Sequence, residues 1–419
     1  MTSLFFVLSL LFGWSAYNLY RPIYRPQGLT VVSFLFGWLT GELALHHILW
    51  QSILVSLFIW GGAVDGFFGA LGMLICLAAW LAMGYFYFQG NEAADEMEAA
   101  LQLALGDEYQ NDILEDLQAQ FPSSPDFEAI KKPFGEIDPA VEVLKDVSFG
   151  NHNQTLDIYR PRHKVDGRPV LFQIHGGGWT EKMGSKNEQG LPLMAHMAKR
   201  DWICVASSYR LSPQATFPEH IIDCKEALVW IKEHIAEYGG DPEFIIVTGG
   251  SAGGHLSSLM ALTANDPDFQ PGFEDQDTTL QGAVPFYGVY DFTNENDLQK
   301  HDGQKSFFES SIMKLSLEGH TAEYQQASPL FRIHDQAPPF LVIHGDKDTL
   351  VPVEEGRLFS EKLLAESSNP VAYAEISGAQ HAFDIFPSIR SEHVKHGIER
   401  FLMWLYTGYL KESDRGTPD

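Results

Sequence analysis

The hydrophobic pattern divides the chain into two unlike parts. Up to about residue 90 the sequence is almost wholly apolar and aromatic, whereas the remainder mixes apolar and polar positions as a water-soluble domain does. The first part contains apolar runs over residues 4–17, 29–64 and 67–88. Since about 20 apolar residues span the hydrocarbon core of a bilayer, residues 1–90 are expected to form a transmembrane region of about three helices.

The run over residues 29–64 decides the number of crossings. The run is too long for one membrane-spanning helix and rather short for two, and it contains polar residues such as Glu42. Three crossings are expected, and four are the alternative. Arg21 and Arg25 are the only Lys or Arg residues before Lys131, so the positive-inside tendency places their loop in the cytoplasm. Three crossings then leave the rest of the chain in the cytoplasm, which is the favoured side, and four place it outside.

Residues 91–135 begin with an acidic stretch that lacks Lys and Arg as far as residue 130. Within it, Met97, Leu101 and Leu105 recur at helical spacing, which predicts an amphipathic helix. The segment is therefore expected to be an acidic helical linker or a lid over a ligand site, and the pattern leaves both open.

Short β-rich runs alternate with amphipathic helical patterns in the third segment, residues 136–419. The runs expected to be strands cover residues 169–174, 202–207, 244–248, 282–286, 340–343 and 372–376. The helical patterns cover residues 186–199, 221–238, 252–262, 353–365 and 392–409. This alternation predicts an α/β fold, in which helices cover both faces of a mostly parallel sheet. In such sheets ligands bind at the carboxyl ends of the strands.

The composition excludes some classes of function. The chain has 28 Lys and Arg residues against 55 Asp and Glu, for a net charge of -27. Nucleic-acid binding requires clustered basic residues, so no nucleic-acid partner is expected. Three cysteines do not make a disulfide framework. No group of His, Cys and acidic residues has metal-ligand spacing, so neither a metal nor a cofactor is expected.

The motif that points most directly to chemistry is Gly-Gly-Ser-Ala-Gly-Gly over residues 249–254. It follows the expected strand 244–248 and opens the helix that begins near Ala252. A serine on a glycine-flanked turn between a strand and a helix is a nucleophile elbow. Ser251 is therefore predicted to be a catalytic nucleophile.

A second glycine-rich loop, His-Gly-Gly-Gly-Trp over residues 175–179, follows the strand that ends at Ile174. It lacks the Lys-Ser/Thr pair of a phosphate-binding loop. The amides of Gly177, Gly178 and Ala252 are expected to form an oxyanion hole. Trp179 is expected to line the substrate pocket, with simple packing as the alternative.

The remaining catalytic roles are a base and an acid that orients it. In serine hydrolases with a nucleophile elbow, the acid and then the histidine follow the serine along the chain. The strand 340–343 runs into a loop with two aspartates, of which Asp348 is preferred and Asp346 is the alternative. His381, on the loop after the strand 372–376, is the predicted base.

Together these motifs resemble the hormone-sensitive-lipase-like carboxylesterase and lipase branch of the α/β-hydrolase superfamily. The resemblance covers about residues 140–410 and rests on four stretches, residues 175–179, 208–213, 251–256 and 344–352. It implies cofactor-free ester hydrolysis and a lid that includes an insertion, here near residues 290–326. Gly250 departs from this branch, which usually has Asp or Thr before the nucleophile. The chain is also similar to kynurenine formamidases and isoprenylcysteine methylesterases.

The sequence thus predicts a multi-pass membrane serine carboxylesterase or lipase that forms an acyl-enzyme on Ser251. A small-molecule or lipid ester is the expected substrate, and the lipid bilayer is the expected partner. An amide or formamide hydrolase, an acyltransferase and a catalytically silent membrane scaffold are the alternatives. The acyl-chain length and the oligomeric state stay open.

Overall fold

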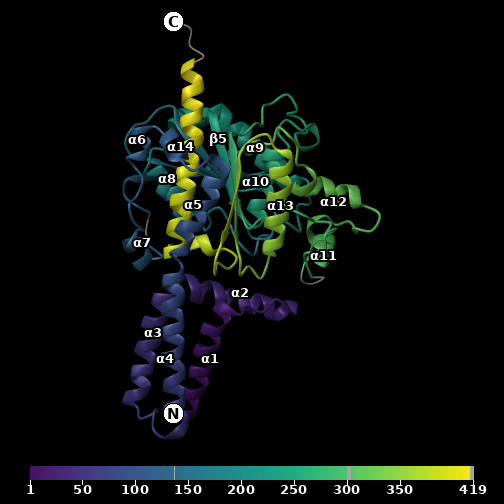
Figure 1. The fold of residues 1–419 in the computed structure, drawn as a ribbon. Helices are drawn as coiled ribbons and strands as arrows, with labels where there is room; N and C mark the ends of the chain where they lie inside the picture. The colour runs from purple at the N-terminus through teal and green to yellow at the C-terminus, as the bar shows by residue number, and fades with distance from the viewer. Residues whose placement is uncertain (136, 300–302, 416–419) are drawn as a thin grey trace.

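The computed structural model describes residues 1–135, 137–299 and 303–415. A bundle of N-terminal helices forms a stalk below an α/β domain that extends from strand β1 to the C-terminal helix α14 (Figure 1). One helix, α2, lies across the top of the stalk and beneath the α/β domain.

The stalk consists of α1 (Thr2–Tyr20), α3 (Ala44–Trp60) and α4 (Gly66–Gln89). Two helical segments of the described chain are long and apolar enough to cross a membrane, Thr2–Tyr20 and Gly66–Leu105. A third span is counted if the bent pair of α2 and α3 is taken as one. The apolar runs expected at residues 4–17 and 67–88 therefore correspond to α1 and α4.

The apolar run over residues 29–64 is not a single span. It divides into α2 (Gln27–Glu42) and α3, which meet at Leu43 with a bend of 92°. The side chain of Glu42, at the end of α2, lies within the α/β domain, where Arg390 Nη1 donates to Glu42 Oε1 at 2.7 Å. This buried ion pair accounts for the polar residue inside an apolar run, and it holds α2 against the domain.

The acidic segment after the stalk contributes to the α/β domain. Helix α5 (Glu92–Leu105) continues directly from α4 and packs against β8 and α14. Its apolar stripe, which includes Met97 and Leu101, is fully buried. The helix therefore covers a face of the sheet. It is followed by three short helices: η1 (Tyr109–Asp112), α6 (Glu115–Gln118) and α7 (Phe127–Lys131).

The sheet has eight strands in the order β1-β2-β4-β3-β5-β6-β7-β8. They are β1 (Val141–Phe149), β2 (Gln154–Pro161), β3 (Arg168–Ile174), β4 (Ile203–Ser207), β5 (Gly240–Gly250), β6 (Gly282–Phe286), β7 (Phe340–Gly345) and β8 (Val371–Ile376). The strands from β4 to β8 pair in parallel, which confirms the mostly parallel sheet, and β2 is antiparallel to both of its neighbours. The sequence pattern missed β1 and β2.

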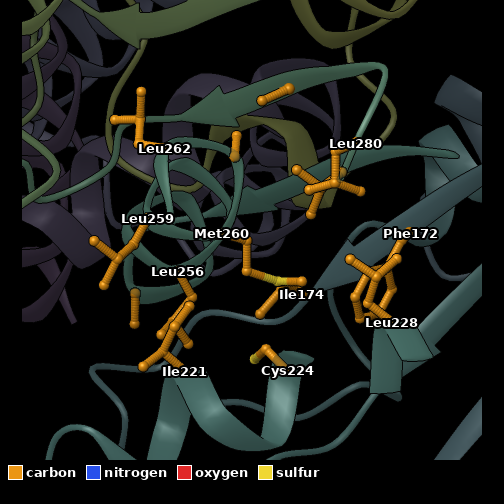
Figure 2. Packing of buried hydrophobic residues seen from close by; sticks show 14 of the residues in the cluster. Phe172, Ile174, Ile221, Cys224, Leu228, Leu256, Leu259, Met260, Leu262 and Leu280 are labelled. Atoms are coloured by element: carbon orange, nitrogen blue, oxygen red, sulfur yellow. The ribbon is translucent and has the colours of Figure 1, made fainter. Parts of the chain in front are cut away.

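Helices cover both faces of the sheet. One core cluster lies between the sheet and α9 (Glu219–His234), α10 (Ala252–Leu262) and α13 (Val353–Glu366), and the other lies beneath α5, α8 (Leu191–Ala198) and α14 (Ile389–Arg415). Successive residues of β3 alternate between the two clusters, as the period of a strand requires. In Figure 2, Leu256 and Met260 of α10 lie close to Ile221 and Cys224 of α9.

The insertion expected near residues 290–326 contains α11 (Gly303–Phe307), the π-helical turn η4 (Phe308–Ile312) and α12 (Thr321–Ala327). Residues 300–302 of this insertion lie outside the described residues. The insertion projects beside the α/β domain, close to the level of α2 (Figure 1).

Candidate active site

Ser251 occupies a sharp turn between β5 and α10. Its φ of 57° and ψ of -119° are unfavourable for a residue with a side chain, and such strain is typical of functional positions. The glycines around it allow the close packing that makes the turn. A Cβ at Gly249 would stand 2.5 Å from the carbonyl oxygen of Ile174, and one at Gly253 would collide with the same oxygen. The local sequence therefore forms the sharp strand-to-helix turn that a nucleophile elbow requires.

The glycine-rich loop after β3 lies beside this elbow. A Cβ at Gly176 would come within 3.2 Å of Ser251 Cβ. Gly177 and Gly178 have positive φ angles of 106° and 59°, which glycine adopts without strain. In the described part of the chain, no hydrogen-bond acceptor is seen for the N–H groups of Gly177 and Gly178. The Ala252 N–H begins α10 and has no acceptor within that helix.

Partly buried Gln189 and buried Tyr209 hold this loop in place. Gln189 Oε1 accepts a hydrogen bond from the Gly176 N–H, and the Tyr209 hydroxyl donates to the carbonyl oxygen of His175 at 3.0 Å. The His175 ring stacks on Tyr209 with centroids 4.4 Å apart. Burial lowers the pKa of His175 to about 4, so its ring is neutral and packs as part of the loop's support.

Trp179 packs in the core, which was the alternative to lining the pocket. Its side chain is 3% exposed, and its indole N–H lies 3.3 Å from His255 Nδ1. The ring also meets Phe292 and Phe308 edge-on. Aromatic residues of α10 and the insertion thus surround Trp179, and its role in lining a substrate pocket stays a prediction.

The acidic and basic side chains expected near Ser251 form a hydrogen-bonded pair. His381 Nδ1 lies 2.6 Å from Asp348 Oδ2, and both side chains are buried. Asp346, the alternative acid, instead accepts a hydrogen bond from the Gly378 N–H at 2.7 Å. Burial alone would raise the pKa of Asp348, but the charge of His381 and hydrogen bonds from His344 and His381 outweigh burial and hold that pKa below its usual range.

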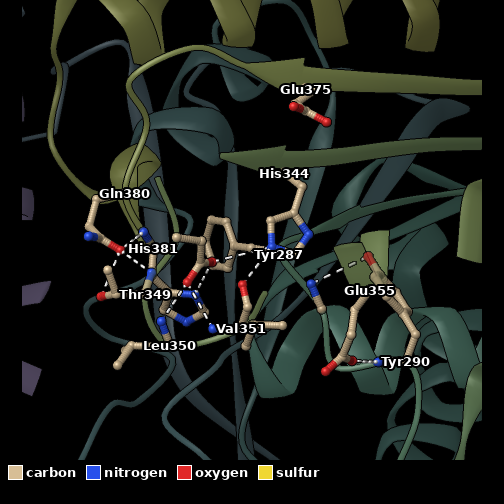
Figure 3. A network of polar contacts seen from close by, with 12 residues as sticks. Tyr287, Tyr290, His344, Thr349, Leu350, Val351, Glu355, Glu375, Gln380 and His381 are labelled. Atoms are coloured by element: carbon tan, nitrogen blue, oxygen red, sulfur yellow. Dashed lines mark hydrogen bonds and ion pairs between the residues drawn. The ribbon is translucent and has the colours of Figure 1, made fainter. Parts of the chain in front are cut away.

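The loop that carries His381 is fixed by a second set of contacts, which Figure 3 shows around that ring. Gln380 Oε1 accepts from the backbone N–H groups of Thr349 and His381, at 2.7 and 3.0 Å. The Asp348 carboxylate also accepts from the N–H groups of Leu350 and Val351, both at 2.8 Å. These bonds tie the acid loop to the base loop.

No hydrogen bond joins Ser251 Oγ to His381 in the described part of the chain. Catalytic hydrogen bonds are often longer in ligand-free enzymes and tighten when substrate binds. No group of three or more His, Cys, Asp and Glu side chains among the described residues could hold a metal ion.

Tyr287, which sequence reasoning did not select, lies against the predicted base. Its ring centroid is 4.5 Å from that of His381, and its hydroxyl donates to the Asp384 carboxylate. Burial and the Asp384 charge raise the pKa of Tyr287 well above its usual value, so the phenol keeps its proton. The sequence signal that could have pointed to Tyr287 is the unusual Gly250, since the Tyr287 hydroxyl fills the space where a side chain at residue 250 would lie.

Comparison with solved structures relates the fold of the α/β domain to that of an esterase. The structure superimposes on the propionate-bound form of a thermophilic esterase from Thermogutta terrifontis with a TM-score of 0.51 and 27% identity, over 67% of this chain and 97% of that one. The domain from β1 to α14 thus has an α/β-hydrolase fold with a mostly parallel sheet of eight strands.

Sequence comparison places the domain among esterases. Residues 156–363 match the BD-FAE family. The chain is 50% identical over 275 residues to the probable carboxylic ester hydrolase LipM of Mycobacterium tuberculosis, covering 65% of this chain and 63% of LipM. It is 45% identical over 259 residues to the esterase LipQ of the same organism, covering 61% of each. The matches thus span less than two thirds of these relatives, and they support a carboxylic ester hydrolase.

Proposed function

We propose that the protein is a membrane-anchored serine hydrolase of carboxylic esters. The observation that carries the proposal is the convergence of three features at the carboxyl ends of β3, β5, β7 and β8: the strained Ser251, the buried His381–Asp348 pair and the unpaired amides of Gly177 and Gly178. The 45–50% identity to LipM and LipQ supports the same chemistry.

In the proposed reaction, Ser251 Oγ attacks the carbonyl carbon of the ester while His381 Nε2 takes the hydroxyl proton. The carbonyl oxygen becomes an oxyanion, which the N–H groups of Gly177, Gly178 and Ala252 stabilise. His381 then returns the proton to the departing alkoxide, and the C–O bond to the alcohol breaks. A water molecule, deprotonated by the same histidine, hydrolyses the acyl-enzyme to release the acid and restore Ser251.

Asp348 orients the base in this scheme. Its hydrogen bond to His381 Nδ1 fixes the tautomer that leaves Nε2 free to accept a proton. Because the pKa of Asp348 is held low, its carboxylate stays charged and stabilises the imidazolium that forms during attack.

The N-terminal helices are proposed to anchor the enzyme through three crossings by α1, α3 and α4. Their exposed surfaces are apolar over most of their length, with residues such as Leu4, Leu49 and Leu81 at least 58% exposed. The Arg21–Arg25 loop lies at the domain end of α1. The positive-inside tendency therefore favours a cytoplasmic location for both the loop and the domain.

The test is hydrolysis of p-nitrophenyl esters from acetate to palmitate by the detergent-solubilised full-length protein. Hydrolysis that requires Ser251 supports the proposal, and the preferred chain length distinguishes an esterase from a lipid hydrolase. A folded protein that cleaves no ester but cleaves amides or formamides, or only transfers acyl groups to alcohols, would contradict it.

A further inference from the structure

Helix α2 has its polar side turned inward and its apolar side turned outward. Thr30, Ser33 and Thr40 are at most 1% exposed, and Gly37 is buried on the same side. The opposite side carries exposed aliphatic residues: Leu29 at 48%, Val31 at 46%, Val32 at 39% and Leu35 at 43%. A helix on a water-soluble protein has the reverse arrangement. The exposed side of α2 is therefore suited to an apolar medium.

On the inward polar side, Ser33 is hydrogen-bonded to Asn18 of α1. Asn18 Nδ2 donates to the Ser33 carbonyl oxygen at 2.8 Å, and Ser33 Oγ donates to Asn18 Oδ1 at 2.7 Å. Ser33 Oγ also accepts from the Ile23 N–H in the preceding loop. These bonds pair Ser33 with Asn18 and the preceding loop, whereas no partner is seen among the described residues for Thr40 Oγ1 or Trp38 Nε1, which are also buried.

The orientation of α2 identifies the medium. The helix lies at 92° to α3 and crosses the end of the stalk nearest the α/β domain (Figure 1). If α1, α3 and α4 cross the bilayer, α2 lies along the bilayer surface at the level where the spans end. A helix with an apolar face in that position inserts its apolar side chains about 5–10 Å into the boundary between headgroups and acyl chains.

The same helix reaches the candidate active site. The Phe34 ring lies edge-on to His381 with centroids 6.0 Å apart, and a Cβ at Gly37 would lie 3.4 Å from Gln380 Nε2. Trp38 stacks on Phe386 with centroids 5.1 Å apart. Close aromatic contacts therefore connect the base loop to the helix that faces the bilayer.

The two ends of α2 contact different parts of the chain: its start contacts the insertion, and its end contacts α14. At its start, Gln27 is in contact with Gly303 in the insertion. At its end, Glu42 forms the buried ion pair with Arg390, and the Ser388 hydroxyl donates to Glu42 Oε2 at 2.6 Å. In the loop before α2, burial and then the charges of Asp346 and Asp348 raise the pKa of Tyr24 to about 12.

From this arrangement we infer that α2 is an in-plane membrane helix that admits ester substrates from the bilayer to Ser251. The substrate class is then an ester with a long acyl chain or another large apolar group that resides in the membrane leaflet. The ester enters between α2 and the α/β domain, past Phe34 and Trp38, so that its acyl chain stays in contact with apolar side chains throughout. This inference rests on the proposed function and adds the route and the substrate class.

The experiment compares two esters with the full-length protein in phosphatidylcholine nanodiscs. One is p-nitrophenyl butyrate added from water, and the other is p-nitrophenyl palmitate incorporated in the bilayer. The test variant carries Leu29→Ser, Val32→Ser and Leu35→Ser. The matched control carries Leu103→Ser, Leu114→Ser and Leu364→Ser, which alters three exposed leucines outside α2, two of them in the segment before β1 and one in α13.

The inference predicts that the α2 variant loses about tenfold or more in palmitate hydrolysis, equivalent to about 1.4 kcal/mol, and keeps its butyrate hydrolysis. The control variant should keep both. Equal loss on both esters, or no loss on either, would overturn the inference. A wild-type protein that is inactive on both esters would refute the proposed function itself, and the inference with it.

A second measurement does not depend on activity. A polarity-sensitive dye is attached at Leu35→Cys and, for comparison, at Leu364→Cys, since the native cysteines are buried. Brominated lipids in the nanodisc should quench the dye at position 35 and leave the dye at position 364 unquenched. A dye at position 35 that reports water would overturn the inference even if the triple variant failed to fold.

Discussion

The hydroxyl group of Tyr287 lies 2.7 Å from the point where a Cβ at residue 250 would stand. The two residues therefore depend on each other. The tyrosine packs against the base only because the residue before the nucleophile has no side chain. The Tyr287 ring packs against the His381 ring, and its hydroxyl donates to Asp384, because Gly250 has no side chain to occupy the same space. Related enzymes with Asp or Thr before the serine would have to arrange this side of the site differently.

This relationship predicts that Gly250→Ala lowers kcat/KM for a short ester by about 10- to 100-fold, because small displacements of catalytic groups have effects of this size. The new methyl group would push Tyr287 off the ring of His381. Gly408→Ala is the matched control, since a Cβ there meets nothing within 4 Å. Steady-state kinetics that show equal effects of the two substitutions would contradict the assigned role of Tyr287.

The two aspartates after β7 allow a direct test of the acid. Asp348→Asn should reduce kcat by about 10⁴-fold, since an amide favours the wrong tautomer of the base. Asp346→Asn keeps an acceptor for the Gly378 N–H and should change kcat by less than about threefold. A larger loss of kcat in Asp346→Asn than in Asp348→Asn would show that Asp346, and not Asp348, orients the base.

Glu355 should make stability depend on pH. This side chain is buried in the first turn of α13, where burial, opposed by a hydrogen bond from the Tyr290 N–H, raises its pKa from 4.5 to about 8. Between these values the folded state binds more protons than the unfolded state, so the contribution of Glu355 to stability falls as pH rises from about 4.5 to about 8.

Glu355→Gln mimics the protonated acid and should remove this dependence. The unfolding temperature of the variant in detergent should exceed that of the wild type at pH 9, and the difference should shrink towards pH 5. Parallel pH profiles of the two proteins would show that Glu355 is not protonated in the folded state.

The ion pair that holds α2 is a fourth target. Glu42 and Arg390 have side chains that are 1% and 3% exposed, so Arg390→Met leaves a buried carboxylate without its partner. Loss of one member of such a pair costs about 3–5 kcal/mol, whereas replacing both members with apolar residues is often neutral. Thermal unfolding should therefore show Arg390→Met to be far less stable than the double variant with Glu42→Met. Equal stability of the two variants would mean that the pair does not hold α2.

The local motifs made the elbow and the parallel sheet predictable. Gly249 and Gly253 allow α10 to approach β3, and the need for small residues at these positions can be inferred from their spacing around Ser251. The acid was also ranked correctly for contact with His381, because Asp348 lies deeper in its loop. Such features depend on residues that are close in sequence or on strands whose order is strongly constrained.

The position of α2 could not be inferred in the same way. Hydropathy measures how apolar a segment is, and it does not record a 92° bend at Leu43. What turns the helix is the contact of Glu42 with Arg390, 348 residues away. Tyr287 was missed for a related reason, since its contacts with His381 and Asp384 arise only when β6 and β8 are brought together. Strand β1 was missed because it is partly exposed and lacks a continuous apolar run, and β2 because polar residues such as the buried Asp157 interrupt its apolar positions.

The central claim is that Ser251 is an activated nucleophile in an ester hydrolase, and covalent labelling tests it most directly. The solubilised protein is treated with a fluorophosphonate, residual hydrolysis of p-nitrophenyl butyrate is followed, and the modified peptide is identified by mass spectrometry. The account predicts one adduct per chain, on Ser251, with activity lost in proportion to labelling and no adduct in Ser251→Ala. Full activity after complete labelling of Ser251, or inactivation through another residue, would contradict it.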